Sequence, residues 1–161
     1  MNRIRVGLVL AVVAVTGIAP HAAGQSPKAA TEPTIVFMCE HGAAKSVIAT
    51  AYFNKIAAER GLPDRAIYRG VNPQAELSAS ALKGLKDDGL TLPPGKPSPI
   101  TPADVAGASY IFAIGCTLPA HAASSGKGDS WNDVPDDQGY AAQRDAIRKH
   151  VERLVDRLQK R

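Results

Sequence analysis

The stretch VFMCEHGAAKSVIATAYF, residues 36–53, joins an apolar run to a short loop and then to a segment with helical spacing. Residues 34–38 are apolar or β-branched throughout, which is typical of a central parallel strand covered on both faces. From Val47 to Ile56, apolar residues recur at helical spacing, and Gly61-Leu62-Pro63 ends that pattern. The stretch therefore predicts a strand, a loop and a helix, with Cys39 as the last residue of the strand.

Further strands and helices alternate along the rest of the chain. Apolar patterns predict strands at residues 66–71 and 109–114, and helices at 77–89 and 140–159. Another helix is expected to begin at Thr101-Pro102-Ala103-Asp104, with Thr101 as its cap. Strands that alternate with helices at short intervals indicate βαβ units. We therefore expect an α/β fold: a single three-layer domain with a short parallel sheet and helices on both faces.

The loop after Cys39 has the composition of an anion-binding turn. In an open parallel sheet, ligands bind at the carboxyl ends of strands, where helix N-termini also lie. Residues 40–44 can turn their N–H groups inward, and Gly42 allows a left-handed backbone within that turn. A thiol held over such amides is expected to be largely thiolate near neutrality, and it can attack a tetrahedral oxyanion bound in the same loop. The expected ligand of such a loop is a tetrahedral oxyanion.

The motif CEHGAAKS, residues 39–46, resembles the Cys-x5-Arg-Ser loop of the low-molecular-weight phosphotyrosine protein phosphatases and of the related thioredoxin-type arsenate reductases. The resemblance extends over most of the chain after its leader. It implies that Cys39 is the nucleophile and that the Ser46 hydroxyl supports its thiolate. The implied oxyanion-binding loop, a phosphate-binding loop after the first strand, consists of Glu40, His41, Gly42, Ala43 and Ala44. Its implied ligand is a phosphate, phosphoester or arsenate-type oxyanion.

Lys45 stands where this family has arginine. Arginine binds two oxygens of an oxyanion with a planar fork, whereas lysine offers a mobile point charge. Loss of one preorganised donor of this kind typically costs about 10²-fold or more in rate. The sequence therefore predicts weak turnover if the site is catalytic.

Family members carry an aspartate before a proline, ahead of the last helix, that protonates the leaving oxygen. The segment SWNDVPDDQGY, residues 130–140, occupies that place, but the expected Asp-Pro pair is broken. Asp133 is the preferred acid, because the nearby Trp131 would desolvate it and raise its pKa. Asp136 is the second choice, and the alternative is that the segment only forms a turn before the next helix.

The segment IFAIGC places Cys116 after the third predicted strand, at the same edge of the sheet as Cys39. In the arsenate reductases a cysteine in this neighbourhood resolves the arsenic adduct, which implies a thiol reductant as partner. A plain disulfide between Cys39 and Cys116 is the alternative. A zinc-type set of these two cysteines with His41 and His121 has no familiar metal-ligand spacing. We therefore predict no metal and no cofactor.

The first 24 residues have the order of a secretory signal peptide: a basic start, an apolar run from Val6 to Ile18, and small residues up to Gly24. We expect residues 25–33 to be a disordered lead-in, residues 34–161 to form the phosphatase-like domain, and the protein to be exported to the periplasm. Membrane contact is expected only through the signal peptide before cleavage.

Without the leader, 17 of the 19 Lys and Arg remain against 15 Asp and Glu, a net charge of +2. No basic stripe is present, so nucleic acid is not an expected partner.

Three hypotheses follow from these residues. The first is phosphomonoester hydrolysis through a phospho-Cys39 intermediate. The second is arsenate reduction with Cys116 as the resolving thiol. The third is a non-catalytic protein that binds an oxyanion or a partner, which Lys45 and the broken Asp-Pro pair favour.

Overall fold

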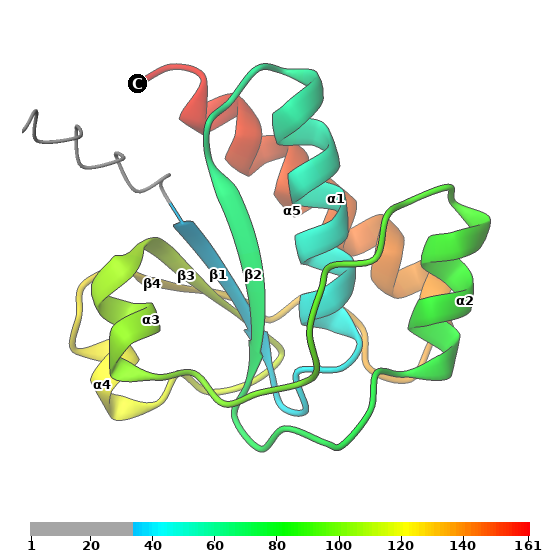
Figure 1. Cartoon of the computed structure of the whole chain (residues 1–161), viewed down its shortest axis with the longest axis horizontal. Helices are drawn as coiled ribbons and strands as arrows, with labels where there is room; N and C mark the ends of the chain where they lie inside the picture. Colours follow the sequence, from blue (N-terminus) through cyan, green and yellow to red (C-terminus); the bar gives the residue numbers. More distant parts are fainter. Residues whose placement is uncertain (1–33) are drawn as a thin grey trace, which may run out of the picture. The chain divides into compact units, whose positions relative to one another are not determined.

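The computed structural model describes residues 34–161 (Figure 1). The predicted signal peptide, residues 1–24, and the predicted lead-in, residues 25–33, lie outside the described residues. The elements are, in chain order, β1 (Thr34–Cys39), α1 (Lys45–Glu59), β2 (Arg65–Gly70), α2 (Ala79–Asp87), α3 (Pro102–Gly107), β3 (Ala108–Ile114), α4 (Ala120–Ala123), β4 (Gly128–Trp131) and α5 (Gly139–Leu158).

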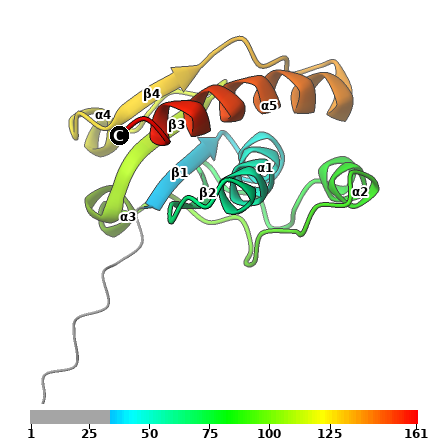
Figure 2. The ribbon, with the colours of Figure 1, turned by 90° about the horizontal axis from the view of Figure 1, so that it is seen from above.

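The four strands form one parallel sheet in the order β2-β1-β3-β4. Helices lie on both faces: α1, α2 and α5 contribute to one buried cluster, and α3 and α4 contribute to the other (Figure 2). The predicted α/β fold with a short parallel sheet is confirmed. Because β1 lies between β2 and β3, its carboxyl end opens at the centre of the sheet edge.

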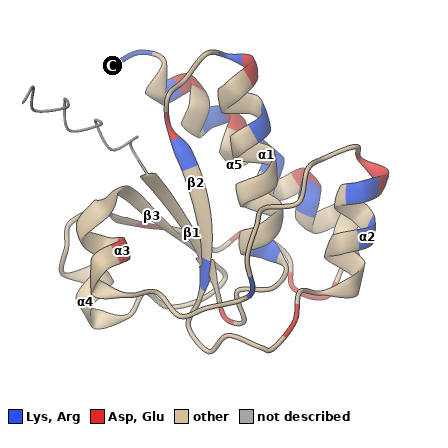
Figure 3. Cartoon of the chain, viewed as in Figure 1, with Lys and Arg blue, Asp and Glu red and all other residues tan. Residues whose placement is uncertain are grey.

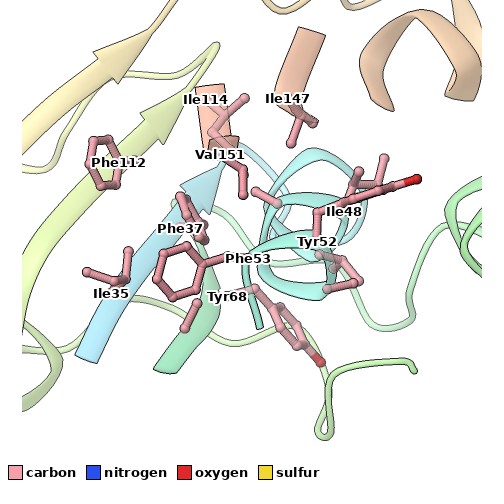
Figure 4. Packing of buried hydrophobic residues seen from close by; sticks show 14 of the residues in the cluster. Ile35, Phe37, Ile48, Tyr52, Phe53, Tyr68, Phe112, Ile114, Ile147 and Val151 are labelled. Atoms are coloured by element: carbon pink, nitrogen blue, oxygen red, sulfur yellow. The ribbon is translucent and has the colours of Figure 1, made fainter. Parts of the chain in front are cut away.

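Strand β1 is buried on both faces, as its uninterrupted apolar sequence predicts. Ile35, Phe37 and Cys39 belong to the cluster with α1 and α5, whereas Val36 and Met38 belong to the cluster with α3 and α4. The Phe37 ring centroid lies 5.9 Å from that of Phe53 and 5.6 Å from that of Phe112 (Figure 4). Burial of each such side chain contributes about 1.5–3 kcal/mol, so the strand that carries Cys39 is firmly anchored.

Two elements differ from the sequence-based expectation. Strand β4 and the short helix α4 were not predicted, because three of the four β4 residues are exposed and its sequence, GDSW, has no apolar alternation. The three predicted strands and the predicted helices are present with ends shifted by one or two residues. The expected cap of α3 is a full capping box, in which Thr101 and Asp104 exchange side-chain and backbone hydrogen bonds.

Charged residues are spread mainly over α1, α2 and α5, whereas α3 and α4 carry few (Figure 3). Many of these charges form ion pairs between neighbouring turns of one helix, such as Lys83 with Asp87 on α2 and Arg148 with Glu152 on α5. In the part of the chain that the structure describes, no helix is both long and apolar enough to cross a membrane.

Candidate active site

Cys39 ends β1 and lies beside the first turn of α1. The residue is 4% exposed, and its Sγ lies 3.2 Å from Oγ of Ser46, which is fully buried. A hydroxyl at this distance can donate a hydrogen bond to a thiolate sulfur. The strand thus fixes the sulfur, and the helix supplies the group that can stabilise its charged form.

The backbone of the loop after Cys39 is arranged asymmetrically. Residues 40–44 form a bend that is neither strand nor helix. Carbonyl oxygens of this turn accept hydrogen bonds from N–H groups of the segment after β2; the acceptors are Cys39, Glu40, His41 and Ala43, and the donors are Val71, Asn72, Gln74 and Ser78. Among the described residues, by contrast, the N–H groups of residues 41–44 donate to no partner, and no side chain caps α1. The carbonyls are satisfied elsewhere, which leaves amide donors and a helix N-terminus available for an anion.

Two glycines hold this loop against the end of β2. Gly42 has a φ of +60°, a left-handed conformation that glycine adopts without strain. A Cβ on Gly42 would lie 2.8 Å from the backbone nitrogen of Gly70, and a Cβ on Gly70 would lie 2.9 Å from the nitrogen of Gly42. The approach of the two backbones therefore excludes any side chain at either position.

Lys45 is the first residue of α1, and its ammonium group is directed to the loop before α5. The residue is 8% exposed, and its Nζ donates a hydrogen bond to Oδ1 of Asp136. Gly115, with a φ of +60°, lies next to this ammonium, and a Cβ there would overlap Nζ. The position of the Lys45 charge thus depends on the absence of a side chain at residue 115.

These groups share one cavity of about 550 Å³. Its lining residues are Cys39, Glu40, His41, Ala43, Ala44, Lys45, Gln74, Ser78, Gly115, Asp136 and Gln143. The structure therefore brings together the predicted nucleophile, most of the predicted loop, Lys45 and Asp136. Gly42 and Ser46 lie behind the cavity wall, where they shape the loop and contact the thiol.

Asp133, the acid preferred from the sequence, does not line this cavity. Its Oδ1 accepts a hydrogen bond from Nε2 of His150 at 2.6 Å, and the His150 ring stacks on Trp131 with centroids 4.6 Å apart. Nδ1 of His150 accepts a hydrogen bond from Arg153 at 2.9 Å. The hydrogen bond from His150 lowers the pKa of Asp133, so the expectation that Trp131 would raise this pKa is wrong. Trp131 instead stacks on His150.

Cys116 lies two residues beyond β3 and is half-buried against the cluster of α3 and α4. Its Sγ is 3.8 Å from the carbonyl oxygen of Met38, and it does not line the cavity. Burial, together with the negative charge of Cys39, raises the pKa of Cys116 to about 11. Both cysteines are free thiols, and Cys39 packs on the opposite face of the sheet.

The zinc-type set is not assembled. In the described range 34–161, no three His, Cys, Asp or Glu side chains come together in a way that could hold a metal ion. His41 lies at the cavity, where its Nδ1 is 3.3 Å from the carbonyl oxygen of Asn72, whereas His121 belongs to the exposed part of α4.

Four cavity residues were not predicted as part of the site: Gln74, Ser78, Gly115 and Gln143. Ser78 also caps α2, where its Oγ accepts a hydrogen bond from the N–H of Ala81. Gln74 and Gln143 lie in segments without a motif, and only the fold brings them to Cys39. Gly115 lay within the segment that drew attention to Cys116, but nothing in the sequence linked it to Lys45.

The family model for low molecular weight phosphotyrosine protein phosphatases matches residues 34–161, which include the complete cavity. The chain belongs to this family. Its resemblance to these phosphatases and to the related arsenate reductases, first indicated by residues 39–46, is thus confirmed. No curated protein sequence matches this family member.

Solved structures of several phosphatases and arsenate reductases share the fold. A low molecular weight protein tyrosine phosphatase from Bacillus subtilis has a TM-score of 0.69 and 21% identity, covering 79% of this chain and 97% of that one. A protein tyrosine phosphatase from Entamoeba histolytica has a TM-score of 0.70 and 18% identity, covering 80% of this chain and 97% of that one. A thioredoxin-dependent arsenate reductase from Corynebacterium glutamicum has a TM-score of 0.66 and 21% identity, covering 81% of this chain and 64% of that one. At these identities the likeness establishes the fold of this phosphatase-family chain, and its activity must be argued from its own residues.

Proposed function

We propose that this chain hydrolyses phosphomonoesters through a phospho-Cys39 intermediate. The observation that carries the proposal is the loop backbone: its carbonyls are bonded to segment 71–78, and its N–H groups remain available beside the thiol. A phosphoryl group bound there would have three oxygens facing amide donors and the N-terminus of α1. Lys45 would add its positive charge from the same cavity.

The first chemical step transfers the phosphoryl group to sulfur. The Cys39 thiolate attacks phosphorus, an S–P bond forms, and the bond from phosphorus to the leaving oxygen breaks. Asp136 donates a proton to that oxygen, because it is the carboxyl group of segment 130–140 that lines the cavity. When phosphoryl oxygens bind the Lys45 ammonium, its ion pair with Asp136 is released and the carboxyl group can carry this proton.

The second step releases inorganic phosphate. A water molecule attacks the phosphorus of phospho-Cys39, the S–P bond breaks, and Asp136 accepts the proton from the water. Ser46 then donates its hydrogen bond to the leaving thiolate. Since Lys45 cannot form the two-point contact of arginine, we expect turnover to be weak.

The test is hydrolysis of 4-nitrophenyl phosphate by the wild type and three variants. Cys39→Ser should abolish turnover, and Asp136→Asn should lower kcat by about 10²-fold, as is typical for loss of a general acid. Asp133→Asn is the matched control and should leave kcat within about twofold, since its carboxylate faces His150. Equal losses for the two aspartate variants would refute the assignment of Asp136.

The same assay separates the other hypotheses. Arsenate reduction requires a resolving thiolate, and the raised pKa of Cys116 with its place outside the cavity argues against that role. A non-catalytic oxyanion-binding protein would bind phosphate in this cavity but release no nitrophenol. Binding without turnover in the reduced wild type would therefore favour the third hypothesis.

We also propose that residues 1–24 are removed on export. The support is the order of basic, apolar and small residues in that segment. Expression of the full chain in a bacterium with a periplasm should give a protein whose N-terminus is Gln25 and which is released by osmotic shock. An intact Met1 on a cytoplasmic product would refute this.

A further inference from the structure

The walls of the candidate active site carry more negative than positive charge. Among its lining residues, two carboxylates, Glu40 and Asp136, face one ammonium group, that of Lys45, which already pairs with Asp136. Oε1 of Glu40 accepts a hydrogen bond from Nδ2 of Asn72 at 2.5 Å, which fixes its carboxylate at the cavity. Within residues 34–161, no Lys or Arg forms an ion pair with Glu40.

A fixed carboxylate at this position opposes a simple phosphate dianion. Glu40 is the residue directly after Cys39. A phosphoryl group bound beside the thiolate would carry two negative charges, and the Glu40 carboxylate would repel them. Repulsion of this kind is relieved when the ligand itself supplies a cation near Glu40. The charge balance of the cavity therefore favours a substrate whose leaving group is positively charged.

Two amide side chains that also line the cavity provide further acceptors. Nε2 of Gln74 donates to the carbonyl oxygen of Glu76 at 2.8 Å, and Nε2 of Gln143 donates to that of Asp136 at 3.1 Å. In the described part of the chain, neither glutamine Oε1 accepts a hydrogen bond, so both can accept one from a ligand. Like the Glu40 carboxylate, these oxygens match a group rich in N–H donors.

The wall offers no surface for an aromatic ring. Among the described residues, no Phe, Tyr or Trp lines the cavity, and its small apolar residues include Ala43 and Ala44. Stacking on a ring therefore cannot select the leaving group here.

We propose that the substrate is a phosphomonoester whose leaving group bears an N–H cation, such as an ammonium group, held by Glu40, Gln74 and Gln143. This rests on the proposed function of the same site. The phosphoryl group binds to the loop amides, and the cation binds to these three side chains of the same cavity. Specificity then depends on the charge of the leaving group.

The test uses two ligands that differ by one ammonium group, 4-(aminomethyl)phenyl phosphate and 4-methylphenyl phosphate. Their dissociation constants are measured by calorimetry on the Cys39→Ser protein, which binds without turning over. We expect the ammonium ligand to bind about tenfold more tightly, the ratio that one charge-assisted contact typically gives. The ratio should decrease as salt is raised.

Glu40→Gln in the same background should reduce the ratio to near one, because the amide removes the charge but keeps the shape. Glu152→Gln on α5 is the matched control and should leave the ratio unchanged, since Glu152 pairs with Arg148 outside the cavity. A ratio near one before mutation, or an undiminished ratio in Glu40→Gln, would overturn the proposal.

Hydrolysis of both ligands by the protein with Cys39 intact separates this proposal from the proposed function. Turnover of both at equal kcat/KM would keep the phosphatase function and overturn the charge preference. A tenfold binding ratio without any turnover would uphold the charge preference and overturn the phosphatase function. Failure of both ligands to bind would overturn both.

Discussion

At the scale of single residues, the replacement of arginine by Lys45 is coupled to a glycine far away in the sequence. Gly115 has a left-handed backbone, and a Cβ there would overlap the Lys45 Nζ. Lys45 is 8% exposed and its Nζ pairs with Asp136, so a side chain at residue 115 would require this ammonium group to shift away from its present position. The position of the Lys45 charge is thus sensitive to residue 115.

Gly115→Ala should displace the Lys45 ammonium and weaken binding of inorganic phosphate about tenfold, as expected when one charged donor is misplaced. Calorimetric titration with phosphate measures this. Gly126→Ala is the control: Gly126 has a similar φ of +70°, but a Cβ there meets nothing within 4 Å. Equal weakening in both variants would show that backbone strain, and not the Lys45 contact, is responsible.

Lys45→Arg should not restore the turnover expected of this family. The larger guanidinium would have to fit between Gly115 and Asp136, and such overpacking typically costs about 1–3 kcal/mol. We expect kcat for 4-nitrophenyl phosphate to stay at or below the wild-type value and the thermal midpoint to fall. A gain of tenfold or more in kcat would contradict this account of the cavity.

Cys116 should behave as an ordinary protonated thiol over the whole neutral range. Burial raises its pKa to about 11, so its thiolate fraction should rise about tenfold per pH unit from pH 7 to 10 and level off near pH 11. The rate of iodoacetamide labelling of Cys116, followed by mass spectrometry in Cys39→Ser, measures this. Because that variant lacks the negative charge of Cys39, its labelling rate should reach the plateau at a slightly lower pH than in the wild type. A plateau near pH 8 would contradict the raised pKa.

The sequence predicted that Cys39 and the loop after it form the site, and both line the cavity, whereas the preferred acid, Asp133, lies outside it and Asp136 lines it. Cys39, Gly42 and Ser46 could be located because a strand, a loop glycine and a helix start are contiguous and fix one another locally. The choice between Asp133 and Asp136 depends on which carboxylate His150 binds, and His150 belongs to α5. Proximity to Trp131 in sequence gave no information on that contact.

At the scale of elements, α2 is joined to α1 and α5 through one carboxylate. Oδ2 of Asp88, at the C-terminus of α2, accepts hydrogen bonds from the hydroxyl groups of Tyr52 at 2.7 Å and Tyr140 at 2.6 Å. Oδ1 accepts one from Arg144 at 3.3 Å. Since Ser78 at the other end of α2 lines the cavity, this junction helps to place one wall of the site.

Tyr52→Phe should destabilise the protein by about 1 kcal/mol at pH 7, the usual net value of a hydrogen bond. Burial first, and then the hydrogen bond to Asp88, raises the pKa of Tyr52 from 10.0 to about 12. A raised tyrosine pKa stabilises the fold below pH 10, and this contribution is lost as the pH rises from about 10 to 12. The wild-type advantage over Tyr52→Phe in urea unfolding should therefore shrink between pH 9.5 and about 11.5.

The pKa of Asp88 shifts in the opposite direction to that of Tyr52. Burial opposes its ionisation, but the hydrogen bonds from Tyr140 and Tyr52 and the charge of Arg144 lower the pKa of Asp88 below its ordinary value of 3.8. Its stabilising contribution is present above that value and is lost only when the pH falls further.

An advantage of the wild type over Tyr52→Phe that stays constant up to pH 11.5 would contradict the role of this junction.

The elements found from the sequence were those with a periodic apolar pattern. Helix α5 was predictable because Ile147, Val151, Leu154, Val155 and Leu158 follow one buried stripe. Strand β4 was not, because its position comes from pairing with β3 and from burial of the single side chain of Trp131. Edge strands of this kind are fixed by the sheet they join.

At the scale of the whole molecule, both hydrophobic clusters and the complete cavity are built from residues 34–161. The fold has one apolar layer on each side of a single sheet, and β1 contributes alternate residues to the two layers. The described residues, 34–161, belong to one compact unit. A domain of this size buries enough surface, about two thirds of that of the unfolded chain, to be stable alone.

A protein that begins at Thr31 should therefore fold and bind phosphate as the protein that begins at Gln25 does. We expect thermal midpoints within about 2 °C, because a larger shift would require a contribution of several tenths of a kcal/mol from residues 25–30. Calorimetric scans and phosphate titrations of the two proteins measure this. A truncation that also removes Thr34 and Ile35 is the contrasting case, since it deletes the start of the central strand and the fully buried Ile35. That variant should lose about 2–5 kcal/mol of stability, whereas loss of cooperative unfolding already at Thr31 would mean that part of the core lies before the sheet.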